Sequence, residues 1–158
     1  MKGARRPLEV ANRHPRLRVD RTAVAAAVGL LDAHAGLFRG GCPSGTLSVA
    51  FLEDPALANL HARFMGDPSA TDVITFAGDA ANNLAGEICV SVDAAARHAR
   101  KTGARLSDEI TLYLVHGWLH LAGYDDRGPS AKRAMRRAEA RAMRLLARSA
   151  AMPRFKLA

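Results

Sequence analysis

The order of strand-like and helix-like segments is the sequence feature that most restricts the fold of this chain. Short segments rich in β-branched residues alternate with longer Ala- and Leu-rich segments, and only helix-like segments follow in the C-terminal part. The predicted strands span 7–13, 46–52, 72–76 and 86–92. The predicted helices span 21–34, 55–66, 93–100, 108–122 and 129–149. This order predicts an α+β fold in which about four strands form a mixed sheet and about five helices pack on it.

Helix boundaries in this chain are marked by ordinary capping residues. Asp20 and Ser107 precede two of the predicted helices, and Pro55 suits the first turn of another. No internal repeat, low-complexity stretch or interdomain linker interrupts the pattern, so we expect residues 1–158 to form a single domain. The tail 150–158 follows the last predicted helix and is expected to fray.

The charge balance is strongly basic. The formal net charge is +8 and the isoelectric point is about 10.5, with arginine the commoner cation. Lys and Arg that neutralise phosphates release counterions, so this balance is consistent with a polyanionic partner, and the alternative is a soluble protein with a solvated basic surface. Aromatic residues make up only 5% of the chain, which argues against base stacking as the main mode of nucleic-acid binding.

The last predicted helix concentrates these positive charges. One acidic residue, Glu139, stands among seven cations, so a surface that contacts RNA or the ribosome is a reasonable hypothesis. The alternative is an ordinary solvated helix face. The cations are Lys132, Arg133, Arg136, Arg137, Arg141, Arg144 and Arg148.

Compartment and membrane signals are weak in this sequence. The two cysteines, Cys42 and Cys89, form no Cys-x-x-Cys pair, which favours a reducing compartment over a disulfide framework. Residues 1–10 carry positive charge without an apolar run behind it, unlike a secretory signal. The longest stretch without formal charge, 110–124, is too short and too polar to cross a bilayer. We therefore expect a cytoplasmic protein with no membrane partner.

The segment 116–126 contains the residues that predict a metal site. His116 and His120 lie at positions i and i+4 of a predicted helix, so their imidazoles share one face about one turn apart. Gly123 is suited to end that helix in the left-handed conformation, which lets Asp126 reach the same point. Two nitrogens and one carboxylate oxygen leave a tetrahedral zinc ion one open position for water, whose pKa falls toward neutrality.

Several alternatives qualify this metal hypothesis. A His pair at this spacing is weak evidence alone, because single histidines are more often structural than ligands. Its support comes from the apolar surroundings, where an unpartnered imidazole carries a desolvation cost, and from the carboxylate that follows. A peptidase of the H-E-x-x-H kind has its general base directly after the first histidine, where this chain has Gly117. We expect glycine there to let a substrate or backbone approach the metal closely.

The same segment closely resembles the signature H-G-x-L-H-L-x-G-Y-D-H of the YbeY family of bacterial endoribonucleases. The last position departs from the signature, because the family has a third histidine where this chain has Asp126. The similarity covers about residues 46–146. Outside the signature it is carried by Thr71–Phe76 (family T-D-V-L-S-F), Gly86–Ile88 (G-D-I), Asn59–Leu60 with Arg63, and Met135 with Glu139.

The resemblance implies a zinc-dependent single-strand endoribonuclease with an α+β fold. It implies a role in ribosomal RNA processing, notably 3′-end maturation of the small-subunit RNA, and in ribosome quality control, with ribosomal RNA and the ribosome or small-subunit assembly proteins as partners. It places His116, His120 and Asp126 as metal ligands, with Asp125 as an alternative third ligand. Arg63 is expected to clamp the scissile phosphate, and with His116 and His120 it completes the predicted catalytic set.

Four further residues near the signature or on neighbouring elements have expected positions or roles. Asp72 is expected either to orient a metal-ligating histidine or to cap a strand start. His61 and His98 are expected at the surface, and Trp118 is expected to pack in the core. The sequence is compatible with two other functions. One is a different metallohydrolase such as a peptidase, and the other is a non-enzymatic ribosome-assembly factor with a structural metal, for which Asp125 would supply a fourth ligand.

Overall fold

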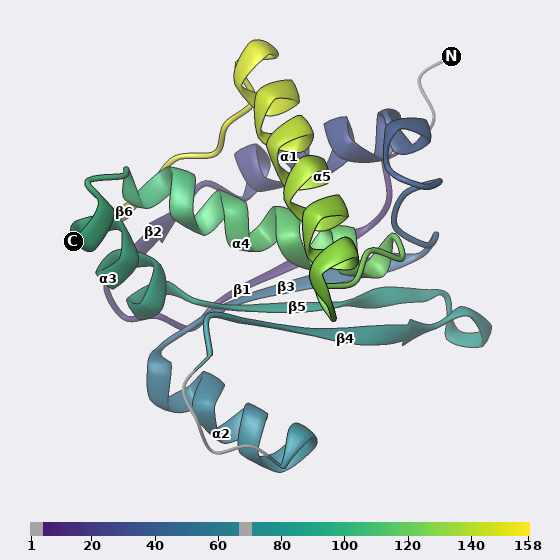
Figure 1. Cartoon of the computed structure of the whole chain (residues 1–158). Coiled ribbons are helices and arrows are strands. Elements are labelled where there is room, and N and C mark those ends of the chain that lie inside the picture. Colours follow the sequence, from purple (N-terminus) through teal and green to yellow (C-terminus); the bar gives the residue numbers. More distant parts are fainter. Residues whose placement is uncertain (1–4, 67–70) are drawn as a thin grey trace.

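A computed structural model describes residues 5–66 and 71–158 of the chain, and its centre is a four-stranded mixed sheet (Figure 1). The sheet contains β1 (Leu8–Asn12), β3 (Thr46–Leu52), β5 (Leu84–Ser91) and β4 (Val73–Asp79), in that spatial order. The pairs β1–β3 and β3–β5 are parallel, whereas β4 pairs antiparallel with β5. Residues 67–70 and 1–4, which belong to the predicted single domain 1–158, lie outside the described residues.

Helices cover both faces of this sheet unequally (Figure 1). On one face lie α1 (Arg21–Ala33), α4 (Leu106–Leu121) and α5 (Pro129–Arg148), whereas α2 (Asp54–Met65) lies alone on the other. The fifth helix, α3 (Val92–Thr102), follows β5 directly at the end of the sheet. These are the five α-helices among the described residues, so the predicted α+β class, strand number and helix number are confirmed.

Strand alternation sorts the apolar residues into two cores. In β3, Val49 and Phe51 join the large cluster under α1, α4 and α5, whereas Ala50 and Leu52 join a small cluster with Leu57 of α2. Successive strand side chains point to opposite faces, so one strand serves both clusters. The larger core includes Trp118, which is fully buried and packs edge-on against Phe38, as its predicted packing role requires. The larger core therefore fixes α4 rigidly on the sheet.

The C-terminal tail is ordered, so the expectation that 150–158 frays was wrong. Its strand β6 (Phe155–Leu157) pairs antiparallel with β2 (Leu17–Val19), a second short strand that the sequence pattern did not predict. Phe155 is 6% exposed and its ring centroid lies 5.3 Å from that of Phe51. Burial of this aromatic side chain explains why the tail is held.

In the part of the chain that the structure describes, no helix is both long and apolar enough to cross a membrane.

Candidate metal centre

The two histidines of the signature lie on the C-terminal half of α4. Their neighbours Trp118 and Leu119 are fully buried, whereas His116 and His120 are partly exposed on the other side of the helix. The helix ends at Leu121 with Ala122 as its C-cap, and Gly123 follows with φ +102°, a conformation that favours glycine. The chain then turns back and brings Asp126 beside the two imidazoles.

Three side-chain atoms meet at this point. The Nε2 atoms of His116 and His120 lie 3.0 Å apart, and Asp126 Oδ2 lies 3.6 Å from each of them. Zinc bonds of about 2.0–2.1 Å in a tetrahedral arrangement require ligand atoms roughly 3.3 Å apart. The three separations bracket that value, so the donor set fits a zinc-sized ion that touches all three atoms. Asp126 is about half exposed, which leaves the remaining side of the group open to solvent.

Asp125 is engaged differently. Its Oδ1 accepts hydrogen bonds from the backbone N–H of Asp126 at 2.7 Å and of Arg127 at 3.3 Å. This carboxylate holds the loop in shape, as Asp commonly does in turns. The structure therefore gathers Asp126, rather than Asp125, with His116 and His120.

Glu139 of α5 is a site residue that sequence reasoning did not assign to the metal centre. Its Oε2 lies 3.8 Å from Nδ1 of His116, the ring nitrogen that faces away from the three-atom group. Burial lowers the pKa of His116, but the nearby carboxylate of Glu139 and the charges of Asp126 and Asp72 outweigh burial and raise it. The available signal was its position as the lone acid among the cations of this helix.

The group lies at the edge of a cleft of about 450 Å³. Among the described residues that line this cleft there is no Lys or Arg, so positive charge must come from a bound ion or from cations outside it. The lining residues are His61, Met65, Thr71, Asp72, Val73, Ile74, Thr75, Ala77, His116, His120, Leu121 and Asp126.

Arg63 is not brought into this cleft. Its side chain is exposed and its guanidinium carbon lies 5.6 Å from the ring centroid of Phe64, on the outer part of α2. His61 and Met65 of the same helix line the cleft instead, so His61, which was expected at the surface, lies at the candidate site. Helix phase explains the difference, because residues two apart on a helix point in well-separated directions.

Asp72 lies on the cleft wall at the start of β4. Its Oδ1 accepts a hydrogen bond of 2.9 Å from the backbone N–H of Val73, and its own backbone carbonyl accepts one of 2.8 Å from Ser91. The capping interpretation of this residue therefore has direct support. Its link to the histidines is electrostatic, as its charge contributes to the raised pKa of His116.

Gly117 has a different role from the expected one. It is buried, and a Cβ atom placed on it would lie 2.5 Å from Cγ2 of Ile88 and 3.1 Å from Oγ1 of Thr75. Ile88 is in β5 and Thr75 is in β4, so the missing side chain lets the sheet, and not a substrate, approach α4. The expectation of substrate access at this position was wrong.

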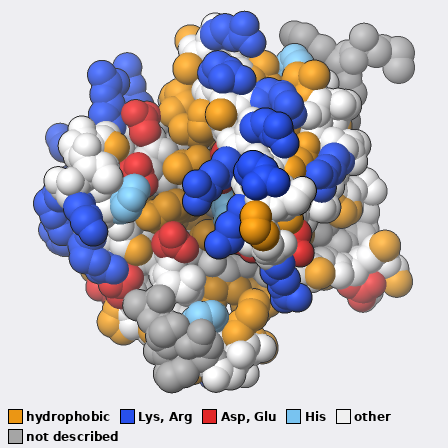
Figure 2. Space-filling view, viewed as in Figure 1, with side chains coloured by type: hydrophobic (Ala, Val, Ile, Leu, Met, Phe, Trp, Pro, Cys, Tyr) orange, Lys and Arg blue, Asp and Glu red, His pale blue; other side chains and the backbone are white. Residues whose placement is uncertain are grey.

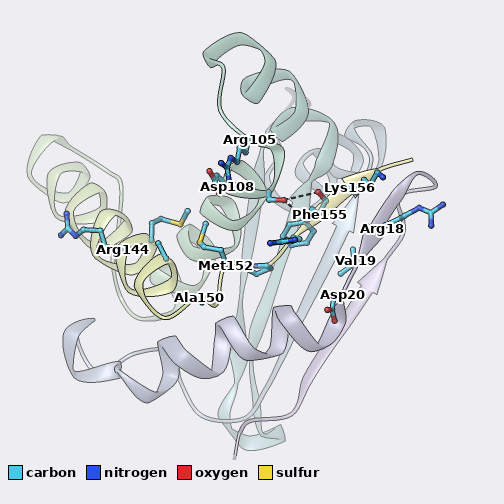
Figure 3. A pocket seen from close by; sticks show the side chains of 15 residues that line it. Arg18, Val19, Asp20, Arg105, Asp108, Arg144, Ala150, Met152, Phe155 and Lys156 are labelled. Atoms are coloured by element: carbon cyan, nitrogen blue, oxygen red, sulfur yellow. Dashed lines mark hydrogen bonds between the residues drawn. The ribbon is translucent and has the colours of Figure 1, made fainter.

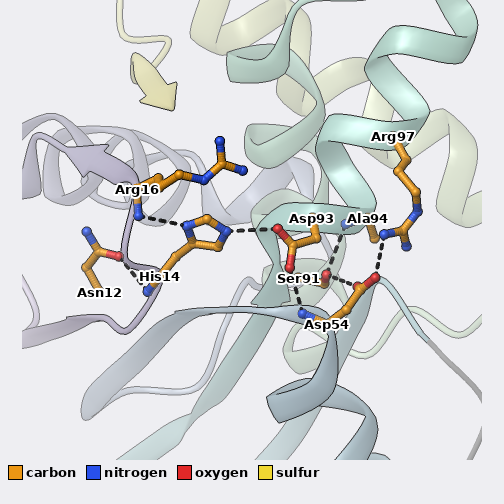
Figure 4. Close-up of polar contacts among 8 residues, drawn as sticks. All are labelled: Asn12, His14, Arg16, Asp54, Ser91, Asp93, Ala94 and Arg97. Carbon is orange, nitrogen blue, oxygen red and sulfur yellow. Dashed lines mark hydrogen bonds and ion pairs between the residues drawn. The ribbon is translucent and has the colours of Figure 1, made fainter. Parts of the chain in front are cut away.

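A second group with ligand-like spacing consists of His14, Glu53 and Asp93. His14 is buried and its Nδ1 accepts a hydrogen bond from the backbone N–H of Arg16, which leaves Nε2 to donate to Asp93 Oδ1 at 2.8 Å (Figure 4). The other oxygen of Asp93 accepts from the backbone N–H of Asp54 at 2.9 Å. Because the imidazole already carries its proton on Nε2, the group is compatible with a metal only after losing these hydrogen bonds.

Fold and site together define a small α+β protein with a candidate three-ligand metal centre of the kind that metallohydrolases use. The chain belongs to the YbeY family, since the family described as endoribonuclease YbeY matches residues 10–147. This confirms the resemblance seen in the sequence.

Two relatives illustrate the extent of the match. A protein named endoribonuclease YbeY from Anaeromyxobacter dehalogenans is 37% identical over 128 residues, which cover 79% of this chain and 60% of that protein. A protein of the same name from Chlamydia pneumoniae is 45% identical over 96 residues, which cover 56% of this chain and 61% of that protein. The chain thus matches about three fifths of the length of these relatives.

A solved structure has the same fold. The solution structure of TM1509 from Thermotoga maritima aligns with a TM-score of 0.60 over 88% of each chain, at 20% sequence identity. At this identity the likeness concerns the fold alone.

Proposed function

We propose that this protein is a metal-dependent endoribonuclease that cleaves single-stranded regions of ribosomal RNA, including the 3′ end of the small-subunit RNA. Membership of the family whose curated members are named endoribonuclease YbeY supports the reaction class. The observation that carries the proposal is the convergence of His116, His120 and Asp126 at zinc-ligand spacing. We extend the proposal to ribosomal partners and to a role in ribosome quality control in the cytoplasm, which the family resemblance of the sequence implies.

The chain's own residues would prepare the site for a metal ion. His116 and His120 present Nε2 as donors, and Asp126 presents a carboxylate oxygen from the loop after α4. Glu139 faces Nδ1 of His116, so it favours the tautomer with the proton on Nδ1 and leaves Nε2 free to bind. A zinc ion held there supplies Lewis acidity and lowers the pKa of nearby water toward neutrality.

Neutralisation of the substrate phosphate needs cations from outside the cleft. Arg63 stands on α2 between His61 and Met65, which line the cleft, and we assign it this role because its side chain is long and exposed and would reach the cleft by turning from the outer side of the helix. Its guanidinium must leave the ring of Phe64 to contact a phosphate. Because the carboxylates at the cleft repel RNA, binding of the ion and of the substrate should be coupled.

The rival functions fit the geometry less well. A structural zinc usually has four protein ligands, but among the described residues the group holds three, and Asp125 is bound to backbone N–H groups instead. A peptidase of the H-E-x-x-H kind needs a glutamate as general base where this chain has Gly117, and Gly117 is packed against the sheet.

Metal content and RNA cleavage of the same preparations test the proposal. We expect wild-type protein to hold about one zinc per chain and to cleave a single-stranded ribosomal RNA fragment, while His120→Ala and Asp126→Ala lose metal and cleavage together and stay folded by circular dichroism. His34→Ala, an exposed histidine on the far end of α1, is the matched control and should retain both. Full cleavage by His120→Ala, or bound metal without cleavage in wild type, would overturn the proposal.

A further inference from the structure

A second concave region lies at the opposite end of α4 from the histidines. It has a volume of about 1250 Å³ and is bounded by the start of α4, the end of α5, and the strands β2 and β6 (Figure 3). Figure 3 shows Arg144 on one side and Arg18 and Lys156 on the other, with Met152 and Phe155 between them. We call this region the terminal groove.

The terminal groove carries excess positive charge. Five of its lining side chains are cations, and two, Asp20 and Asp108, are acids, so the difference is three positive charges. Asp20 is already occupied, since it accepts a hydrogen bond from the backbone N–H of Ala23 and caps α1. The cations, all of them exposed, are Arg18, Arg105, Arg144, Arg154 and Lys156.

These cations have no fixed partner among the described residues. Across residues 5–66 and 71–158, none of the five makes a side-chain hydrogen bond or an ion pair with an acid, in contrast to Arg6, which pairs with Asp32 at 2.7 Å. Unpaired arginines that converge on one groove are suited to phosphate oxygens, which accept their forked donors.

Helix α5 links the groove to the candidate metal centre, because it contributes a side chain to each of them. Glu139 of this helix reaches His116, Arg136 lies three residues before it, and Arg144 lines the groove five residues after it. Figure 2 shows Lys and Arg side chains covering the outer surface of α5. Along α4, Ser107 at the groove and His120 are separated by roughly 20 Å at 1.5 Å per residue. A stacked single strand covers that span with about six nucleotides.

We propose that the terminal groove binds the phosphate backbone of the RNA strand whose scissile bond lies at the metal centre, about six nucleotides away. This inference rests on the proposed function. The basic helix α5, which contributes side chains to both the groove and the metal centre, favours RNA over an acidic protein segment, because an acidic segment would not need cations between the two places. Because the described lining includes no exposed aromatic residue, base stacking is weak there and binding should tolerate any sequence.

Strand length separates this proposal from its alternatives. Affinities of the zinc-loaded protein would be measured by fluorescence anisotropy at early times, with RNA strands of about five and about fifteen nucleotides over a range of salt concentrations. The groove variant is Arg105→Gln with Arg144→Gln. The matched control, Arg13→Gln with Arg100→Gln, removes the same charge from exposed cations outside the groove and outside α5.

We expect the groove variant to bind the long strand several-fold more weakly, with a salt slope shallower by about 1.4 for two lost phosphate contacts. Its affinity for the short strand should change no more than that of the control. Equal weakening for both lengths, or no weakening for either, would overturn the groove proposal, and the second result would leave an acidic protein as the better occupant. Absence of RNA cleavage by the wild type would instead refute the proposed function. The two failures are distinguishable, because anisotropy measures RNA binding whether or not the RNA is cleaved.

Discussion

Glu139 and His116 form a contact between two helices that links the basic helix α5 to the candidate metal centre on α4. Glu139 Oε2 lies 3.8 Å from His116 Nδ1, whereas His116 Nε2 faces His120 and Asp126. The two nitrogens of one imidazole therefore have separate partners. A carboxylate behind a ligating histidine fixes its ring orientation and increases its basicity.

Replacing Glu139 should weaken metal binding without removing a ligand. We expect Glu139→Gln to lower zinc affinity by roughly 10-fold and Glu139→Ala by more, within the range of about 10–100-fold seen for such partners. Competition with a chromogenic chelator measures the change. Glu87→Gln is the control, because Glu87 is an exposed acid of β5 that does not line the cleft. Equal zinc affinity in Glu139→Gln and wild type would show that the contact plays no part in the site.

Asp126 sets the net charge of the site, so Asp126→His should alter both affinity and pH dependence. An imidazole is a softer, neutral ligand, and it leaves more of the ion's charge uncompensated, so nearby water becomes more acidic. We expect tighter zinc binding and a shift of the acidic limb of kcat/KM to lower pH. Asp125→His should show neither change, since that carboxylate holds the loop backbone. A pH profile identical to wild type would argue against Asp126 as a ligand.

The main elements could be predicted from the sequence because their signals are local. The strand 46–52 and the helix bearing the histidines carry their own periodicity and boundary residues. The strands β2 and β6 span three residues each and exist through pairing between Leu17 and Leu157, at opposite ends of the chain. Such short segments have no periodicity to detect, and they are ordered by their long-range pairing together with the burial of Phe155.

Some features of the candidate site could likewise be predicted from local sequence, and others could not. The pairing of His116 with His120 follows from helical spacing, and Gly123 marked the turn that returns Asp126. The contact of Glu139 and the outward position of Arg63 depend on how α5 and α2 are rotated against their neighbours. Tertiary packing sets that rotation, so residue type and spacing could not predict it.

Gly117 should be intolerant of even one added methyl group. In Gly117→Ala the new Cβ would meet Ile88 at 2.5 Å, between a helix and a sheet strand that are both held by the core. Overpacking of this kind costs about 1–3 kcal/mol of unfolding free energy. Urea denaturation followed by Trp118 fluorescence measures it. Gly36→Ala is the control, because a Cβ there has no atom within 4 Å. Similar stability of the two variants would mean that α4 and the sheet can separate freely.

Asp93 should make folding sensitive to acid. Burial raises its pKa, but the backbone N–H of Asp54, the hydrogen bond and charge of His14 and the charge of Arg97 together lower it below its ordinary value. A carboxyl with a depressed folded-state pKa stabilises the protein above its unfolded pKa of about 3.9, and this stability is lost as pH falls through the folded value.

Substitution of this carboxylate should therefore flatten the acid side of the stability curve. We expect Asp93→Asn to lower the unfolding free energy by about 1–2 kcal/mol at neutral pH, with the difference from wild type vanishing well below pH ~4. Denaturant titrations of metal-free protein across that range measure both effects. Glu53→Gln is the control, because it removes the same charge beside the network and the side chain of Glu53 makes no hydrogen bond or ion pair among the described residues. A constant difference between Asp93→Asn and wild type at every pH would mean that packing, and not the charge of Asp93, stabilises this junction.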